Sequence, residues 1–254
     1  MGCSRQNTCP ALGNLTITLE TRPYPGYKQF SAIQIIETGN INKVITKQHI
    51  INWIKECALI FAEKRAYLTE LDSPIGDADH GTNMNRGFSK AREKLESVQD
   101  TDIGNILKTI GMTLISSVGG ASGPLFGTFF IRAGGAVPSK HELDTTDLRN
   151  LLQAGLDGLI QRGRAEPGEK TMVDALYTTV DAANIAVEKN DDVNSALSLV
   201  IIAAEKGVRA TIPMIAKKGR ASYLGEKSAG HQDPGATSIY FILQALRDVV
   251  TSDE

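Results

Sequence analysis

Helical periodicity runs from Thr46 almost to the end of the chain, and it constrains the fold more than any other feature of the sequence. Apolar residues recur there at intervals of three and four, the spacing that places them along one face of an α-helix. We expect Thr46 to cap the first helix. We interpret Trp53 as a packing residue and His49 as a surface residue of that helix. Its apolar residues are Ile50, Ile51, Trp53, Ile54, Cys57, Ala58, Phe61 and Leu68.

The same spacing predicts eight helices and no strand after Thr46. The expected segments are about 46–70, 84–95, 102–117, 125–134, 146–161, 172–187, 193–217 and 235–250. Pro213 is expected to kink the seventh helix, and Thr171 to cap the sixth. The connections are mostly short, which favours antiparallel neighbours. The predicted fold class is therefore all-α, with eight antiparallel helices in an up-and-down arrangement.

Three aspartates, Asp72, Asp77 and Asp79, lie close together between the first two predicted helices. Such carboxylates repel one another unless a cation lies among them, and hard oxygen ligands suit Mg²⁺ or Ca²⁺ rather than zinc. An EF-hand is excluded, because counting from Asp77 puts Thr82 where that loop needs Gly and Phe88 where it needs Glu. We therefore expect a divalent metal site. The alternative is a polar turn, in which Asp and Asn side chains bond to nearby backbone.

Two helix N-termini near this region are candidate phosphate sites. Asn83 is expected to cap the helix beginning at Met84, which would leave backbone N–H groups beside the metal. Residues 116–124 contain a run of small residues, Gly119 to Gly123, and then Pro124, which we place at the first position of the next helix. Such a turn lets a phosphate approach closely, although close packing of two helices would explain its glycines equally well. It is not a P-loop, because no Lys-Ser or Lys-Thr follows.

Two more polar stretches, residues 163–170 and 218–238, follow the fifth and seventh predicted helices. The second is long for a helical domain, and long loops in compact domains tend to be functional. Arg220 is a candidate for binding phosphate charge, and Asp233 is expected to cap the last helix. In an up-and-down arrangement, the loops after the first, third, fifth and seventh helices lie at one end. The four polar stretches should therefore meet there, where a phosphate-bearing ligand with Mg²⁺ would fit.

Composition narrows the function classes. A formal net charge of −2 over 254 residues gives no global basic field, so nucleic acid is not an expected partner. The cysteines Cys3, Cys9 and Cys57 form neither a zinc pattern nor a disulfide framework, and a reducing cytoplasm is the simplest setting. No apolar run approaches the roughly 20 residues that a membrane helix needs. We expect no membrane association.

Residues 1–44 differ from the rest and are treated as an irregular, poorly ordered N-terminal extension, followed by a domain over residues 45–254. Two short β-branched or alternating pieces, 15–19 and 33–36, are candidate strands. The start resembles a myristoylation signal, but Gln6 stands where Ser or Thr is expected. No chemistry is assigned to this segment.

Four motifs together resemble one family. They are Gly-Asp-Ala-Asp-His-Gly at 76–81, Ser-Val-Gly-Gly-Ala-Ser-Gly-Pro at 117–124, Lys-Gly-Arg-Ala-Ser-Tyr-Leu-Gly-Glu at 218–226 and His-Gln-Asp-Pro-Gly-Ala at 231–236. In order and content they resemble the nucleotide-binding L subunits of dihydroxyacetone kinases, from about residue 45 to the C-terminus. The resemblance implies a barrel of eight antiparallel helices.

The resemblance also implies a ligand set. It implies ADP or ATP at one end of the barrel, held through two Mg²⁺ ions by Asp72, Asp77 and Asp79. The nucleotide contacts that it implies are His80, Gly81, Thr82, Asn83, Ala121, Ser122, Gly163, Met172, Arg220, Asp233, Pro234 and Gly235. No side chain is expected to act as a catalytic base, because phosphoryl transfer depends mainly on positioning and charge neutralisation. His80 is interpreted as a positioning donor rather than a phosphorylated nucleophile.

The length of the chain favours one kind of family member. ATP-dependent members carry a substrate-binding K domain and an L domain in one polypeptide, for which this chain is too short. The resemblance therefore implies a separate cytoplasmic L subunit of a phosphotransferase-system kinase. Its bound ADP would be phosphorylated by a phosphohistidine of the M subunit and would pass the phosphoryl group to dihydroxyacetone on the K subunit. We also expect a homodimer.

Two alternatives remain open. The chain could be an L-type subunit that uses exchangeable ATP or serves another short ketose. It could also be a nucleotide-sensing subunit that binds a regulator of transcription. Kinetics with ATP alone would test the first, and a pull-down with and without ADP the second.

Overall fold

The computed structural model describes residues 44–98 and 100–252, so the predicted extension 1–44, with its candidate strands, lies almost wholly outside the described residues. The division at residue 44 stays a prediction. The described residues form nine α-helices, two 3-10 segments and two short strands. In chain order these are β1 (Ile45–Thr46), α1 (Lys47–Glu63), α2 (Arg65–Asp72), α3 (His80–Lys94), η1 (Leu95–Ser97), α4 (Ile103–Ser117), α5 (Ser122–Ala136), β2 (Glu142–Leu143), α6 (Thr145–Gly163), α7 (Met172–Glu188), α8 (Val193–Ala210), η2 (Arg220–Ser228) and α9 (Pro234–Thr251).

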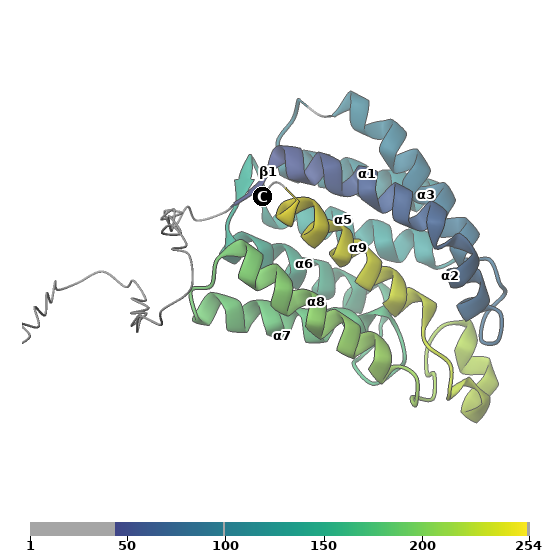
Figure 1. Cartoon of the computed structure of the whole chain (residues 1–254). Coiled ribbons are helices and arrows are strands. Elements are labelled where there is room, and N and C mark those ends of the chain that lie inside the picture. The colour runs from purple at the N-terminus through teal and green to yellow at the C-terminus, as the bar shows by residue number, and fades with distance from the viewer. Residues whose placement is uncertain (1–43, 99, 253–254) are drawn as a thin grey trace, which may run out of the picture. The chain divides into compact units, whose positions relative to one another are not determined.

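The helices pack as a closed ring. From α3 to α9 each α-helix packs against the next one in the chain, while α1 contacts both α3 and α9 and so closes the ring (Figure 1). The first predicted helix is divided into α1 and α2, so nine α-helices stand where eight were predicted among the described residues. The predicted all-α helical barrel is confirmed.

The prediction of no strand after Thr46 was wrong in one detail. Ile45 pairs with Leu143 and Thr46 with Glu142 in an antiparallel ladder, and the amide of Lys47 donates to the carbonyl of His141 at 2.9 Å. Each strand has two residues, which is too short to show the alternation by which strands are recognised. The ladder ties the start of α1 to the connection between α5 and α6.

Aromatic rings fill the core and connect distant helices. Trp53 of α1 lies 5.4 Å from Phe130 of α5, measured between ring centroids, and Phe61 of α1 stacks on Phe88 of α3 at 4.6 Å. The indole N–H of Trp53 donates to the carbonyl of Ile242 in α9 at 2.7 Å, so this buried polar atom is paired. All four rings are fully buried. The predicted packing role of Trp53 is confirmed.

Three predicted N-caps are present. Thr46 and Thr171 each form a capping box, with His49 and Asp174 respectively as the reciprocal partner. Asp233 caps α9 by accepting from the amide of Ala236 at 2.7 Å. Each such cap stabilises a helix by about 1 kcal/mol. The prediction that His49 lies on the surface was wrong, because its ring turns back to the cap and the residue is buried.

Besides the start of α3, which lies at His80 rather than Met84, three predicted helix boundaries were wrong. The first helix breaks at Lys64, whose backbone (φ −85°, ψ 6°) leaves the helical region and separates α1 from α2. Helix α5 begins at Ser122, so Pro124 is its third residue rather than its first; the N–H that proline lacks would have no helical partner at either position. Helix α8 ends at Ala210, and Pro213 follows the helix instead of kinking it. The hydroxyl of Thr211 donates to the carbonyl of Val208 and helps to end the helix there.

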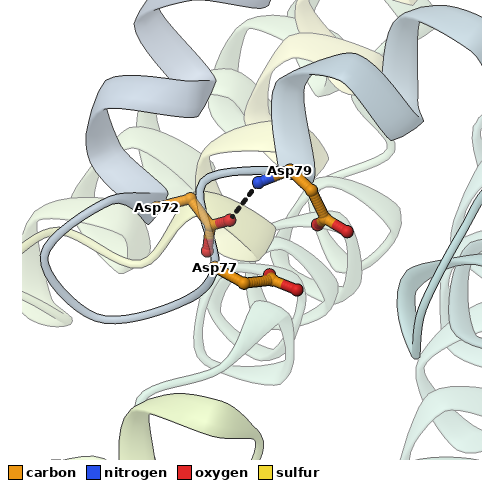
Figure 2. Close-up of side chains that lie close together, drawn as sticks. All are labelled: Asp72, Asp77 and Asp79. Atoms are coloured by element: carbon orange, nitrogen blue, oxygen red, sulfur yellow. Dashed lines mark hydrogen bonds between the residues drawn. The ribbon is translucent and has the colours of Figure 1, made fainter.

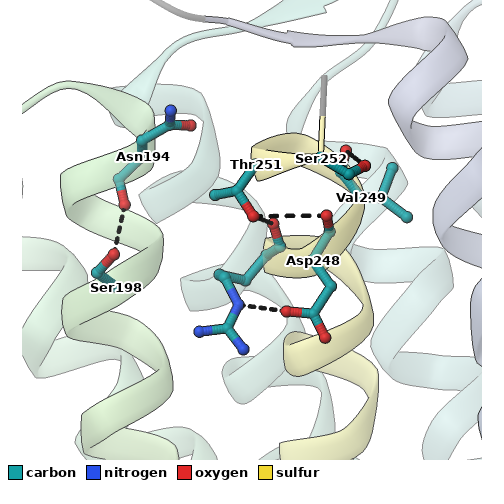
Figure 3. Close-up of polar contacts among 7 residues, drawn as sticks. Asn194, Ser198, Asp248, Val249, Thr251 and Ser252 are labelled. Carbon is teal, nitrogen blue, oxygen red and sulfur yellow. Dashed lines mark hydrogen bonds and ion pairs between the residues drawn. The ribbon is translucent and has the colours of Figure 1, made fainter. Parts of the chain in front are cut away.

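At the C-terminal end of α9 the carbonyls are satisfied locally. Thr251 donates from its hydroxyl to the carbonyl of Arg247 at 2.9 Å, and Ser252 donates to that of Val249 at 3.0 Å (Figure 3). These bonds close a helix end that would otherwise leave acceptors unpaired. No helix among the described residues is both long enough and apolar enough to cross a membrane.

The thiol of Cys57 is expected to be unreactive in the folded protein. The side chain is fully buried, and burial, assisted by the charge of Glu56, raises its pKa well above the ordinary value. In a C3S/C9S variant, Ellman's reagent at pH 8 should label Cys57 only after guanidinium is added, because the thiolate is the reacting species. A C3S/C9S/S198C protein, which gains a thiol at an exposed site on α8, should react at once with one equivalent. Rapid labelling of Cys57 without denaturant would contradict this packing.

Candidate functional site

A cavity of about 490 Å³ opens at the end of the ring where the four polar stretches meet. The aspartate loop, the glycine turn, the connection before α7 and the loop before α9 all contribute to its wall. The wall includes the following predicted site residues: Asp72, Asp77, Asp79, His80, Ala121, Ser122, Gly163, Met172, Arg220, Asp233, Pro234 and Gly235. The up-and-down topology thus brings together segments that are far apart in the sequence.

The three aspartates converge at this cavity (Figure 2). One oxygen from each of Asp72, Asp77 and Asp79 lies within 4.8 Å of the others. Asp72 ends α2 and is only 8% exposed; its Oδ2 accepts from the amides of Asp79 at 3.0 Å and of His80 at 3.2 Å. Asp77 and Asp79 are exposed. Three carboxylates with open positions on the solvent side form a donor set that fits Mg²⁺, which takes a few carboxylates and fills its other positions with water or phosphate.

Gly76 is part of this arrangement, although it was not among the predicted site residues. A Cβ atom at this position would lie 1.9 Å from Oδ1 of Asp72. The amide of Gly76 donates to the backbone carbonyl of Asp72 at 2.6 Å. Ala78 adopts a left-handed backbone (φ 59°), which is uncommon for a residue with a side chain. The loop therefore turns tightly enough to bring Asp77 and Asp79 back beside Asp72.

Arg220 already supplies a positive charge to the cluster. Its Nη2 lies 2.8 Å from Oδ2 of Asp77, and its side chain is 67% exposed. Burial and the charges of Asp79 and Asp72 raise the pKa of Asp77, while Arg220 acts in the opposite direction. Because the pair is exposed, it contributes little to stability and can rearrange when a ligand arrives.

His80 is held as a neutral ring. Its Nε2 lies 2.8 Å from the hydroxyl oxygen of Ser238 and its Nδ1 lies 3.3 Å from that of Ser122. Burial lowers the pKa of His80 to about 4, so the imidazole is uncharged at neutral pH. Both ring nitrogens have hydroxyl neighbours, which fits the predicted positioning role. Ser238, in α9, was missed because nothing in the sequence relates it to a residue 158 positions earlier.

The glycine turn presents the N-terminus of α5 to the cavity. Gly120 has a left-handed backbone (φ 63°), and no side chain caps α5 at Ala121. The first amides of this helix therefore lack a capping side chain and lie at the positive end of the helix dipole. Gly119 packs against α3, since a Cβ there would lie 2.6 Å from Oδ1 of Asn83. The turn therefore packs closely against α3 and also leaves the N-terminus of α5 without a side-chain cap.

Three predicted nucleotide contacts do not lie on the cavity wall: Gly81, Thr82 and Asn83. The prediction that Asn83 caps a helix starting at Met84 was wrong, because α3 begins at His80. The earlier start turns these residues to other faces of α3. Gly81 faces α2, where a Cβ would lie 2.0 Å from the carbonyl oxygen of Arg65, and Asn83 is buried and accepts from Arg86.

The inner part of the cavity is largely apolar. Leu125 and Leu159 contribute to it together with Ala165, Met172 and Val173. Asp233, at the N-terminus of α9, has a pKa raised to about 7 by burial, and its carboxylate accepts from the amide of Ala236. Of these residues only Met172 was predicted; Leu125, Leu159 and Val173 were missed because they belong to apolar helix stripes that are typical of core.

Comparison with known proteins gives a consistent result. The sequence model described as the DAK2 domain matches residues 74–248. The chain is 54% identical over 202 residues to the PEP-dependent dihydroxyacetone kinase, ADP-binding subunit DhaL, of Escherichia coli (strain K12), covering 80% of this chain and 96% of that protein. It is 40% identical over 207 residues to the PTS-dependent dihydroxyacetone kinase, ADP-binding subunit DhaL, of Lactococcus lactis subsp. lactis (strain IL1403), covering 82% of this chain and 100% of that protein.

Solved structures share the fold. The dihydroxyacetone kinase of C. freundii in its native form superposes with a TM-score of 0.61 at 22% identity, over 90% of this chain and 38% of that one. The same kinase in complex with AMP-PNP and Mg²⁺ gives a TM-score of 0.56 at 23% identity, over 91% and 38% of the two chains. This chain therefore shares the fold of one part of that longer kinase.

Proposed function

Because the chain belongs to the DAK2 domain family, we propose that it is the ADP-binding subunit of a phosphotransferase-system dihydroxyacetone kinase. The observation that carries the proposal is the convergence of three carboxylates, an exposed arginine and an uncapped helix N-terminus around one cavity. The likeness to two ADP-binding subunits over nearly their whole length supports the proposal.

The acidic cluster would hold two Mg²⁺ ions against the diphosphate. Bound there, such ions would neutralise charge on the phosphate oxygens, which is much of what phosphoryl transfer requires. The Asp72 carboxylate is fixed for this role by the hydrogen bonds that it accepts from two backbone amides. The side chains of Asp77 and Asp79 face solvent and can adjust their positions. The preformed position of Asp72 reduces the cost of ordering the site when the ligand binds.

The remaining phosphate contacts would come from backbone and from Arg220. The α5 N-terminus offers amides at Ala121 and Ser122, and its dipole favours negative charge. Arg220 lies next to the cluster and can move from Asp77 to a phosphate oxygen, since a planar guanidinium binds both groups well. The apolar wall formed by Leu125 and Leu159 with Met172 would take the adenine ring.

The transfer itself would occur at the open rim. The outer two carboxylates are exposed, so a phosphohistidine of an M subunit and a dihydroxyacetone on a K subunit could each approach the terminal phosphate from outside. No side chain in the described part of the cavity is placed as a nucleophile, because His80 is buried and both of its ring nitrogens face hydroxyl groups. The chain's task is to position the nucleotide. We propose that it does so in the cytoplasm.

Nucleotide retention tests this function. Protein purified without added nucleotide should carry about one equivalent of ADP per chain, as measured by mass analysis of the denatured supernatant, and EDTA should release it because the carboxylates then lose their cations. With K and M subunits and the phosphotransferase proteins present, phosphoenolpyruvate should support dihydroxyacetone phosphorylation. A chain that neither retains ADP nor binds it with Mg²⁺ contradicts the proposal. Turnover with ATP alone would favour the exchangeable-ATP alternative.

A further inference from the structure

A buried lysine lies beneath the loop that carries Arg220. Lys170 is 1% exposed, and no other lysine or arginine is buried within residues 44–98 and 100–252. It directly precedes the Thr171 cap of α7, and its left-handed backbone (φ 62°) turns the chain there. The residue is also part of the cavity wall. Burying an ammonium costs free energy unless its N–H groups are hydrogen-bonded. The groups to which it donates therefore indicate what the side chain does.

The ammonium of Lys170 joins the two ends of one segment. Its Nζ donates to the carbonyl of Thr211 at 2.6 Å, to that of His231, and more weakly to that of Ile212 at 3.5 Å. An ammonium has three N–H donors, and three carbonyl oxygens surround this one. Thr211 is the C-cap of α8, and His231 lies two residues before the Asp233 cap of α9. The residues between them form a loop that is closed at its base by the Lys170 side chain.

Further bonds complete the closed base. The hydroxyl of Thr211 accepts from the amide of Asp233 at 3.0 Å, and the amide of Gly230 donates to the carbonyl of Ile212 at 2.8 Å. Within the loop, the hydroxyl of Ser228 accepts from the amide of Ala216 at 2.8 Å. The bonds of Thr211 and Ile212 join the same two ends of the loop that the Lys170 ammonium joins.

The closed loop carries Arg220, the residue that pairs with Asp77 of the acidic cluster. Residues 218–221 from this loop line the cavity, and Arg220 alone among them makes an ion pair with the acidic cluster. We propose that Lys170 is a positioning residue, whose buried ammonium fixes the base of the loop 211–231 and thereby places Arg220 against the nucleotide phosphates. The nucleotide part of this statement depends on the proposed function, whereas the pinning of the loop does not.

Charge is needed here as well as length. Replacing Lys170 by Met keeps much of the side-chain volume but leaves the three carbonyls without a donor, and the loop can then separate at its base. The negative charges of Asp233 and Asp174 favour the ammonium, opposing the lowering of the Lys170 pKa that burial causes. Three carbonyl oxygens surround the nitrogen, and only the protonated side chain has three N–H donors to offer them, so the ammonium is the form that holds the loop.

Hydrogen exchange on nucleotide-free protein tests the pinning directly. In K170M the amides of 211–231, among them Ala216 and Gly230, should exchange about tenfold faster or more, while peptides of α1 and α4 stay unchanged. K206M, which removes an exposed lysine of α8, is the matched control and should exchange like wild type. Unchanged exchange in the loop of K170M would overturn the proposal. If K170M does not fold, K170Q, which keeps two N–H donors, replaces it with a smaller expected increase.

A double-mutant cycle tests whether Lys170 acts through Arg220. K170M and R220Q should each weaken Mg²⁺–ADP binding about tenfold, and K170M/R220Q should bind no worse than R220Q alone, within about twofold. Effects that multiply would mean that Lys170 contacts the ligand itself or is only structural, and would overturn the positioning role. If wild type binds no ADP at all, the proposed function fails, while the exchange experiment still decides whether Lys170 holds the loop.

Discussion

Replacing Asp79 by Asn is expected to weaken Mg²⁺-dependent ADP binding by about 100-fold or more, because loss of a direct ligand exceeds the roughly 10–100-fold cost of losing a supporting group. Asp79 is the best of the three positions for this test. It occupies the N-cap position of α3, but its side chain makes no capping bond, so Asn should preserve the helix. Asp72, by contrast, accepts hydrogen bonds from two backbone amides, and these bonds order the loop.

The measurement is titration calorimetry with ADP at fixed Mg²⁺, repeated in EDTA. Asp181→Asn, at an exposed position of α7, is the matched control and should bind like wild type. Without metal, D79N should also unfold at a slightly higher temperature than wild type, because one of three mutually repelling charges is gone. Equal ADP affinity of D79N and wild type would show that the acidic cluster does not hold the ligand's cations.

Adding one methyl group between α4 and α5 is expected to destabilise the protein by about 1–3 kcal/mol, the usual cost of overpacking. These helices meet at glycines: a Cβ on Gly111 would lie 2.6 Å from the carbonyl oxygen of Gly127 and 2.9 Å from the amide nitrogen of Ile131. Both atoms belong to backbone, so the helices themselves must move apart in Gly111→Ala. In a domain of this size each kcal/mol corresponds to about 2–4 °C in Tm.

Gly135→Ala provides the control on the same pair of helices. A Cβ at Gly135 meets nothing within 4 Å, so the substitution should stabilise α5 by up to about 1 kcal/mol through helix propensity alone. Chemical denaturation with both variants measures the difference. If Gly111→Ala were as stable as Gly135→Ala, the close approach of α4 and α5 would be refuted.

Much of the fold could be predicted from the sequence because the signals for a helix, its apolar stripe and its caps, are local. The stripe from Ile50 to Phe61 places the core face of α1, and the caps at Thr46, Thr171 and Asp233 are short-range signals that each bond within three residues. The gathering of polar stretches at one end followed from helix count and short connections. Helix starts were less predictable: α3 begins before Met84 because tertiary packing of Gly81 on α2 continues the helix upstream of its Asn.

The candidate site was predicted only in part. The three aspartates were found because they crowd one short loop, and Arg220 and Asp233 because they lie in a long polar one. Lys170 and Ser238 were not found, since their partners are distant in the sequence: the carbonyl of His231 for one and the ring of His80 for the other. Hydrogen bonds between segments so far apart leave no period or spacing in the chain.

The sequence by itself determined that this chain forms amphipathic helices with short connections and carries its acidic and glycine-rich loops at alternate junctions. Those properties depend on neighbours within one or two helical turns. Only the tertiary structure decided which faces of α3 meet the cavity, that Asp72 is held by two amides, and that one buried ammonium closes the loop of Arg220. Closing the helices into a ring sets these distances, because it brings backbone and side chains from separate helices into contact at one end.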